Sequence, residues 1–254
     1  MNSSRFHGKV ALVTGGGTGI GRATARAFAR EGATVVVAGR GTEALSGTVE
    51  LIEKEGGRAS LVTADVTVED DVARVVETVV ERHGGLDVAH NNAGILGRPG
   101  PLADLDSDTW RRVLDVNLTG VFLSMKHEIR QMRARGGGAI VNTSSTIGPH
   151  LRRPMLAAYG TSKAGVSALT RAAALDHIGD GIRVNAVSPG ASDAPMSLLP
   201  GESPEQRHER LAPSIPLGRV GTLDEVVGAV LWLASDEAGF AVGHDLVVDG
   251  GASA

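Results

Sequence analysis

The repeated alternation of short, wholly apolar runs with longer segments of helical spacing constrains the fold of this 254-residue chain most strongly. Seven runs have the length and continuous apolar character of buried strands. They cover residues 9–15, 33–40, 59–66, 86–94, 138–145, 182–190 and 244–251. Strands that are apolar on both faces are typical of a parallel sheet that helices cover on both sides. The pattern therefore predicts an α/β fold built from β-α-β units.

The segments between these runs predict the helices. We expect helices over residues 21–32, 42–57, from the third strand to about 82, 109–133, 159–178 and 224–235. No linker, repeat or low-complexity tract divides the chain, so we expect one domain over residues 1–254. The longest irregular stretch, about 191–219, carries a short helical pattern near "SPEQRHERL". A loop this long in a compact domain is usually a lid or binding loop, which predicts a substrate loop here.

Composition argues against several classes of function. The net charge is −4 and the charges are interspersed, which gives no reason to expect binding to nucleic acid or to a membrane surface. The chain has no cysteine, so disulfides, thiolate metal sites and thiol nucleophiles are excluded. No apolar run approaches the ~18 residues of a membrane span, and the N-terminus lacks the apolar region of a secretory signal. We therefore expect a cytoplasmic protein.

The histidines do not predict a metal site or a hydrolase. His150 lies in a loop expected near the site, and His83 and His90 flank the fourth strand. None of the eight histidines lies at metal-ligand spacing from a second histidine and a carboxylate. The chain also lacks the G-x-S-x-G elbow of a serine hydrolase.

A glycine-rich turn follows the first strand. In "VTGGGTGIGRA", Gly15, Gly19 and Gly21 lie between that strand and the next helix. Such a turn lets backbone N–H groups meet a pyrophosphate at a helix N-terminus, where the helix dipole favours anions. A structural turn is the alternative. The position at the first β-α junction favours nucleotide binding, because ligands bind at the carboxyl ends of parallel strands.

The only tyrosine of the chain, Tyr159, precedes Lys163 by four residues. On a helix, residues at this spacing lie on one face. A free phenol has a pKa of ~10, and a nearby ammonium can lower such a pKa by ~1–3 units. Tyr159 would then be a usable general acid and base. The alternative is an exposed tyrosine beside a surface lysine.

Six segments, in order along nearly the whole chain, resemble motifs of the short-chain dehydrogenase/reductase family. They are "TGGGTGIG" (14–21), "NNAG" (91–94), "VNLTG" (116–120), "SS" followed by "YGTSK" (144–163), "SPG" (188–190) and "VDGG" (248–251). The resemblance implies a single Rossmann-type, doubly wound domain with a mainly parallel seven-stranded sheet. It also implies a nicotinamide cofactor, a homotetramer, and the interconversion of a secondary alcohol and a ketone by hydride transfer.

The resemblance also implies a role for each of four catalytic residues. Tyr159 would exchange the proton of the hydroxyl group, and Ser145 would hydrogen-bond the substrate oxygen. Lys163 would bind the nicotinamide ribose as well as act on Tyr159. Asn117 would hold a water of the proton relay. The alternatives are a turn serine for Ser145, and for Asn117 a helix amide that bonds backbone.

The same resemblance implies the cofactor contacts. They are Gly15, Thr18, Gly19, Ile20, Gly21, Arg40, Asp65, Val66, Asn92, Ala93, Gly94, Tyr159, Lys163, Pro189, Gly190 and Ser192. The end of the second strand indicates which cofactor binds. Gly39 stands where an aspartate would repel a 2′-phosphate, and Arg40 offers a cation suited to bidentate phosphate contact. We therefore expect NADP and allow NAD, although Thr18 takes the place of a second basic residue, and Arg40 in solvent is the alternative.

Two positions depart from the family pattern. Tyr159 follows Ser145 by fourteen residues, one more than expected, and the extra residue is assigned to the loop 149–155. Ala194 stands where a threonine often contacts the nicotinamide carboxamide, so Ser192 or a backbone group would substitute. Two other functions remain open: an isomerase or dehydratase of the same fold, and a catalytically weak nucleotide-binding regulatory or scaffold protein.

Overall fold

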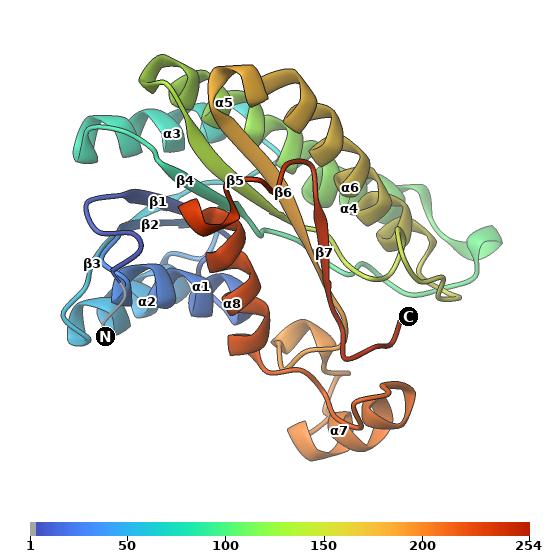
Figure 1. The fold of residues 1–254 in the computed structure, drawn as a ribbon. Coiled ribbons are helices and arrows are strands. Elements are labelled where there is room, and N and C mark those ends of the chain that lie inside the picture. The colour runs from blue at the N-terminus through green and yellow to red at the C-terminus, as the bar shows by residue number, and fades with distance from the viewer. Residues whose placement is uncertain (1–3) are drawn as a thin grey trace.

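The computed structural model describes residues 4–254. Over these residues, one seven-stranded parallel sheet has the order β3-β2-β1-β4-β5-β6-β7 (Figure 1). Its strands are β1 (Val10–Thr14), β2 (Thr34–Gly39), β3 (Arg58–Thr63), β4 (Val88–Asn91), β5 (Gly138–Thr143), β6 (Ile182–Pro189) and β7 (Asp245–Val248). The order reverses between β1 and β4, which is the switch point of a doubly wound fold. The predicted α/β class and parallel sheet are confirmed.

Helices cover both faces of the sheet (Figure 1). The helices on one face are α1 (Gly19–Arg30), α2 (Thr42–Lys54) and α8 (Leu223–Ala234). Those on the other face are α3 (Glu69–His83), α4 (Ser107–Leu114), α5 (Gly120–Arg135) and α6 (Ala157–His177). No helix of the described part of the chain is long and apolar enough to cross a membrane.

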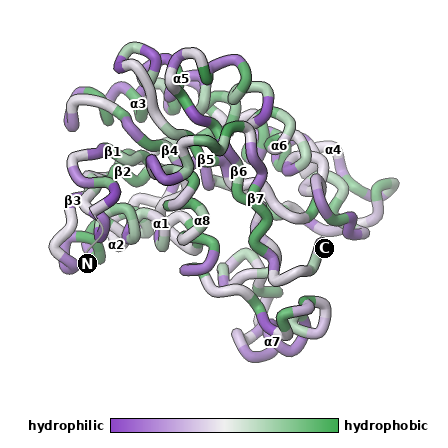
Figure 2. The backbone as a smooth tube through the Cα atoms, viewed as in Figure 1, coloured by the Kyte–Doolittle hydropathy of each residue, from purple (hydrophilic) through white to green (hydrophobic). Residues whose placement is uncertain are grey.

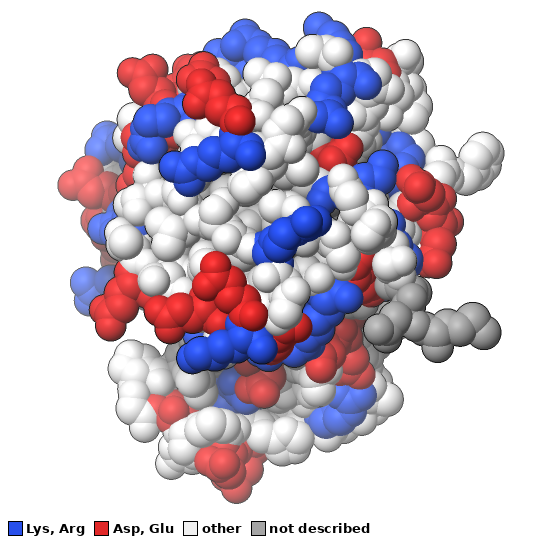
Figure 3. Space-filling view, turned by 90° about the vertical axis from the view of Figure 1, so that its left-hand side faces the viewer, with Lys and Arg blue, Asp and Glu red and all other residues white. Residues whose placement is uncertain are grey.

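The strands alternate their side chains between two aliphatic layers. Leu12 and Val36 join one buried cluster, whereas Val13 and Val37 join the other. Successive strand residues point to opposite faces, so one apolar run serves both layers. Figure 2 shows hydrophobic strands at the centre and mixed polarity on the outer helices. Figure 3 shows acidic and basic side chains interspersed over one face.

The helix expected over residues 109–133 is present but contains a π turn. A π turn, η2 (Asp115–Thr119), separates α4 from α5 and contains the buried Asn117. The expected strands are also longer than the observed ones. In particular, β4 ends at Asn91, so Asn92 and Gly94 lie in the following loop. Apolar runs can extend past the point where strand pairing stops, as at Ala64, which is buried just after the end of β3.

The stretch 191–219 contains its own short helices. They are η4 (Pro195–Ser197), α7 (Pro204–Leu211) and η5 (Ala212–Ser214). The short helical pattern predicted here is therefore confirmed as α7. A capping box starts α7: Ser203 accepts from the backbone of Gln206, and the Gln206 side chain accepts from the backbone of Ser203. The segment lies below the carboxyl ends of the strands, away from the main helix layers (Figure 1).

Candidate active site

The predicted site residues gather at the carboxyl edge of the sheet. The glycine turn follows β1, Arg40 follows β2, Ser145 follows β5, and Gly190 follows β6. In an open α/β sheet this edge is where ligands bind, at the point where the strand order reverses. The fold therefore brings segments from the whole chain to one place.

The glycine turn fits a pyrophosphate. Gly15 and Gly19 have φ values of +65° and +51°, which side chains rarely adopt. A Cβ on Gly21 would lie 2.3 Å from the backbone oxygen of Gly15. The turn and α1 can approach this closely only without side chains. Thr18, the N-cap of α1, makes no side-chain cap within the described structure, so the backbone N–H groups there are available to an anion.

The loop after β4 is fixed against this turn. Thr14 Oγ1 accepts hydrogen bonds from the backbone N–H groups of Asn92 at 3.1 Å and Ala93 at 3.3 Å. The Asn92 side chain donates to the backbone oxygens of Thr14 at 3.3 Å and Gly15 at 3.4 Å. Ile20 packs against the core on the α1 side. The two loops thus form one rigid wall of the site.

Tyr159 and Lys163 lie on successive turns of α6. The Lys163 ammonium lies 5.9 Å from the centre of the Tyr159 ring and donates to the Thr143 backbone oxygen at 2.7 Å. Burial lowers the pKa of Lys163 to about 8. Burial also raises the pKa of Tyr159 above its ordinary value of 10.0, while a hydrogen bond with Ser145 acts to lower this pKa. Tyr159 and Lys163 are therefore neighbours, as expected. The contribution that lowers the Tyr159 pKa comes from Ser145 and not from Lys163.

The two serines after β5 have different partners. Ser144 Oγ donates to the Lys163 backbone oxygen at 3.0 Å and pairs with Ser167 Oγ at 2.8 Å. Ser145 Oγ accepts from the backbone N–H of Ile147 at 3.1 Å. The hydrogen bonds of the Ser144 hydroxyl are therefore made to residues of α6. Ser145 is the serine whose hydroxyl acts on the pKa of Tyr159, and it stays the catalytic candidate of the two.

The Asn117 side chain is fully hydrogen-bonded inside the protein. Its amide accepts from Ile95 N–H at 2.8 Å and donates to the Ile95 backbone oxygen at 2.8 Å and to Ser162 Oγ at 3.1 Å. The structure thus contains the alternative arrangement, in which the Asn117 side chain hydrogen-bonds the protein backbone. A Cβ on Gly94 would lie 3.3 Å from Asn117 Oδ1 and 3.6 Å from Lys163 Nζ. The loop after β4, the π turn and α6 therefore meet at Gly94.

His90, on β4, lies behind Lys163. Its Nε2 pairs with Thr143 Oγ1 at 2.9 Å. Burial, and then the charge of Lys163, lower the pKa of His90 to about 3, so this imidazole stays neutral. The lysine side chain is consequently held by the Thr143 backbone oxygen without a second cation beside it. Backbone partners such as this oxygen leave no signal in the sequence.

The adenosine side of the site holds Arg40, Asp65 and Val66. The Arg40 guanidinium is 58% exposed and lies 3.9 Å from the Asp65 carboxylate, at the limit of an ion pair. Asp65 Oδ1 accepts from the backbone and side chain of Thr67, at 3.0 and 2.8 Å. Val66 packs where α5 begins, beside Gly120. Arg40 is therefore largely available to a ligand.

The start of the 191–219 loop faces the glycine turn. A Cβ on Gly19 would lie 3.2 Å from Pro195 Cδ and 3.8 Å from Ala194 Cβ. Gly190 N–H donates to the Val248 oxygen at 2.9 Å, and Pro189 O accepts from Thr146 N–H at 3.1 Å. Ser192 is buried and its backbone oxygen accepts from Ser197 Oγ at 2.8 Å. The structure gives no contact between the Ser192 hydroxyl and the catalytic residues.

Sequence reasoning missed a buried carboxylate at the start of β7. Asp245 accepts from Ser167 Oγ at 2.5 Å and Ser188 Oγ at 2.6 Å, and pairs with His150 Nε2 at 3.1 Å. His150 comes from the loop after Ser145, where the extra residue is assigned. The signal in the sequence was Asp245 itself, an acidic residue in the otherwise apolar strand β7. Within residues 4–254, no cluster of histidine and acidic side chains could hold a metal ion.

Comparisons with known proteins agree with this geometry. A family model described as Enoyl-(Acyl carrier protein) reductase matches residues 15–253. The cis-4-hydroxycyclohexanecarboxylate dehydrogenase of Sinomonas cyclohexanicum is 45% identical over 249 residues, which span 98% of each chain. The cyclohexanol dehydrogenase of Acinetobacter sp. (strain SE19) is 42% identical, over 98% of this chain and 96% of that one.

A solved structure shows the same relationship. The crystal structure of a short-chain type dehydrogenase/reductase from Mycobacterium marinum matches with a TM-score of 0.93 at 38% identity, over 99% of this chain and 98% of that chain. A nucleotide site at the switch point of a parallel sheet defines a dinucleotide-binding α/β enzyme. The chain belongs to the short-chain dehydrogenase/reductase family, whose dehydrogenases use NAD or NADP.

Proposed function

We propose that this enzyme interconverts a secondary alcohol and a ketone, with Tyr159 as the general acid and base. The observation that carries the proposal is the grouping of Tyr159 with Ser145 and Lys163 at the carboxyl edge of the sheet, where Lys163 lies beside Gly94. A bound nicotinamide cofactor would accept or supply the hydride at the alcohol carbon. The chain itself must then move the proton and stabilise charge on the substrate oxygen.

Each residue of this group has a distinct task in the proposal. Tyr159 takes the hydroxyl proton during oxidation and returns it during reduction. Ser145 donates a hydrogen bond to the substrate oxygen, where charge develops. Lys163 adds positive charge near the phenol and reaches the ribose of the cofactor. Because the Asn117 side chain is already bonded, its backbone carbonyl, in the π turn, is the group left to hold a relay water.

The cofactor contacts support NADP as the preferred cofactor, with NAD use allowed. The backbone from Gly15 to Gly21 would receive the pyrophosphate, and Arg40 the 2′-phosphate. Asp65 and Val66 would border the adenine, and the segments 92–94 and 189–192 would border the nicotinamide. Ala194 lacks the hydroxyl that relatives use there, so the carboxamide would rely on backbone groups.

The substrate is inferred to be a cyclic secondary alcohol. Two relatives are named for hydroxylated or oxidised cyclohexane rings. The 191–219 segment, our proposed lid on a single catalytic domain, exposes Met196 and Leu199 by 46% and 53%. These apolar side chains could cover a ring.

Assembly and location remain predictions. A homotetramer would bury the exposed apolar side chains Phe122 and Leu175 on α5 and α6, together with Phe240 before β7. Light scattering at micromolar concentration tests this assembly, and a monomer would contradict it. A cytoplasmic location rests on composition alone.

The test of the function is a substrate panel. Cyclohexanone, 4-oxocyclohexanecarboxylate and an acyclic ketone are each supplied with NADPH and with NADH, and oxidation of the cofactor is followed by absorbance. We expect turnover of the cyclic ketones, faster with NADPH. Cofactor binding without turnover of any carbonyl compound would favour the regulatory or scaffold alternative.

A further inference from the structure

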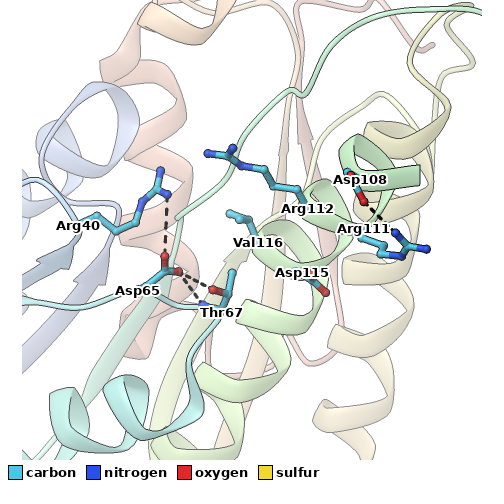
Figure 4. A pocket seen from close by; sticks show the side chains of 8 residues that line it. All are labelled: Arg40, Asp65, Thr67, Asp108, Arg111, Arg112, Asp115 and Val116. Carbon is cyan, nitrogen blue, oxygen red and sulfur yellow. Dashed lines mark hydrogen bonds and ion pairs between the residues drawn. The ribbon is translucent and has the colours of Figure 1, made fainter. Parts of the chain in front are cut away.

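A hollow of about 380 Å³ lies beside the adenosine side of the proposed cofactor site. Its lining joins two parts of the chain that are distant in sequence (Figure 4). Residues after β2 and β3 supply one side, and α4 with the π turn supplies the other. The lining residues are Arg40, Asp65, Thr67, Asp108, Arg111, Arg112, Asp115 and Val116.

Two guanidinium groups face this hollow from opposite sides. Figure 4 shows Arg112 extending from α4 toward the side that carries Arg40. Arg112 is exposed, and its side chain forms no hydrogen bond or ion pair with any residue from 4 to 254. Arg40 has only the 3.9 Å approach to Asp65. Arg112 therefore has no carboxylate partner among these residues, and Arg40 has only the long ion pair with Asp65.

The other charged groups of the lining are occupied or turned away. Arg111 pairs with Asp108 at 2.9 Å, one helical turn apart on α4. Asp115 points away from Arg40 in Figure 4. One oxygen of Asp65 is taken by the two hydrogen bonds from Thr67. The positive charge that remains directed into the hollow belongs to Arg40 and Arg112.

Two like charges that share a hollow repel each other unless an anion lies between them. A phosphate monoester carries nearly two negative charges at neutral pH, and guanidinium groups bind its oxygens in pairs. Val116, one turn after Arg112 on the same face, offers an apolar surface beside the anion. The lining therefore suits a phosphate attached to a larger, partly apolar group such as a nucleoside.

We propose that Arg112 is a second determinant of cofactor specificity, which binds the 2′-phosphate of the adenosine ribose together with Arg40. This arrangement supplies from α4 the second cation that the glycine turn lacks, where Thr18 stands. The proposal rests on the proposed cofactor site, but it concerns binding of the adenosine half and does not depend on catalysis.

The test uses calorimetric titration of the full-length protein with adenosine 2′,5′-bisphosphate, adenosine 5′-monophosphate and inorganic phosphate. We expect the parent to bind the bisphosphate more tightly than the monophosphate. Arg112→Ala should weaken bisphosphate binding roughly tenfold, since hydrogen bonds to charged groups are stronger than neutral ones. Monophosphate binding should stay unchanged. In Arg40→Ala/Arg112→Ala the preference for the bisphosphate should disappear.

Arg130→Ala is the matched control, because it removes an exposed helical arginine, on α5, that does not line the hollow. It should bind all three probes like the parent. Unchanged bisphosphate binding in a folded Arg112→Ala protein would overturn the proposal, as would a parent without preference for the bisphosphate. Tight binding of inorganic phosphate alone, equally in all variants, would also overturn it.

These outcomes are separate from those of the substrate panel. An enzyme that reduces ketones with NADH alone would support the proposed reaction and contradict the proposed role of Arg112. A protein that binds the bisphosphate through Arg112 but turns over no ketone would support the proposed role of Arg112 and contradict the proposed reaction.

Discussion

His150 and Asp245 lie 95 positions apart in the chain, yet His150 Nε2 lies 3.1 Å from the Asp245 carboxylate. Asp245 is 7% exposed at the start of β7, whereas His150 belongs to the loop that follows Ser145. The pair fixes this loop to the far edge of the sheet. It thereby holds in place the loop to which the extra residue of the chain is assigned.

His150→Ala should release this loop. We expect KM for the alcohol to rise roughly tenfold, as for the loss of a hydrogen bond to a charged group. Changes in kcat and in cofactor affinity should be smaller, because the proton-transfer residues are held by α6 and β5. Steady-state kinetics measures KM and kcat, and cofactor titration measures the cofactor affinity. His177→Ala is the control, since it removes a similar pair with Asp180 at the other end of α6; equal effects of the two changes would contradict the prediction.

Tyr159→Phe should remove the proton donor and leave the fold and cofactor binding intact. Loss of one general acid and base typically lowers the rate ~10²–10⁴-fold. Turnover, circular dichroism and cofactor titration are compared on the same preparation. More than about half of the parent activity would show that Tyr159 is not the acid and base.

Alcohol oxidation should accelerate with pH throughout the alkaline range. Oxidation needs the phenolate of Tyr159, and burial raises the pKa of this phenol above 10.0, so the reactive fraction keeps growing. Reduction needs the phenol, which is already populated at neutral pH, and should not share the rise. Because Lys163, with a pKa of about 8, titrates beside Tyr159, the measured values belong to the pair. Single-turnover hydride transfer measures this, and a flat oxidation profile would argue against a phenol base.

Gly39→Asp should move the cofactor preference from NADPH toward NADH. A Cβ at Gly39 would lie 3.7 Å from Leu45 Cδ2 and 4.0 Å from Gly15 Cα, so a side chain fits without displacement. The carboxylate would repel a 2′-phosphate and accept a hydrogen bond from a 2′-hydroxyl, a change of roughly tenfold or more. Gly39→Ala adds the same carbon without charge and should keep the parent preference. Direct titration with both reduced cofactors decides the outcome.

Glu128, fully buried on α5, should make stability depend on pH. Burial raises the pKa of Glu128 from 4.5 to about 7, with Asn91 acting in the opposite direction. The folded state therefore holds this proton more tightly than the unfolded chain. The contribution is fully present below pH 4.5, and it is lost as pH rises to 7.

The glutamine side chain in Glu128→Gln cannot ionise, so this variant should not lose this stability as the pH rises. The variant should exceed the parent by up to ~3 kcal/mol above pH 7, at about 1.4 kcal/mol per pKa unit, and much less at pH 5. Urea unfolding at equal protein concentration measures the difference. Glu53→Gln, an exposed change on α2, is the control. A parent whose stability rises between pH 5 and pH 8 in step with Glu128→Gln would contradict the assignment.

Local patterns predicted the fold and the strand ends at which the candidate site residues lie, because the physical causes of these patterns are local. Apolar runs report buried strands, and the spacing of Gly15, Gly19 and Gly21 reports a turn that excludes side chains. Tertiary partners carry no such pattern. The Thr143 oxygen that holds Lys163 is a backbone atom, and the His150–Asp245 pair depends on where distant segments meet.

The π turn at Asn117 shows the same limit inside one helix. The helical backbone continues through this turn from α4 to α5, so the expected extent of the helix is right, but the residue pattern does not mark the π geometry. Likewise, the Tyr159–Lys163 spacing predicted proximity correctly, but only the folded environment shows that burial outweighs other influences on the phenol pKa.

The 191–219 segment, together with the adjoining Val220, has an apolar centre of its own, formed by Leu211, Ile215 and Val220. Arg210 further ties α7 to Glu202 within the same segment. These side chains lie outside the two layers that stabilise the sheet. We therefore expect that the segment can be exchanged between relatives as one unit, without disturbing the residues that hold Tyr159 and Lys163 on α6.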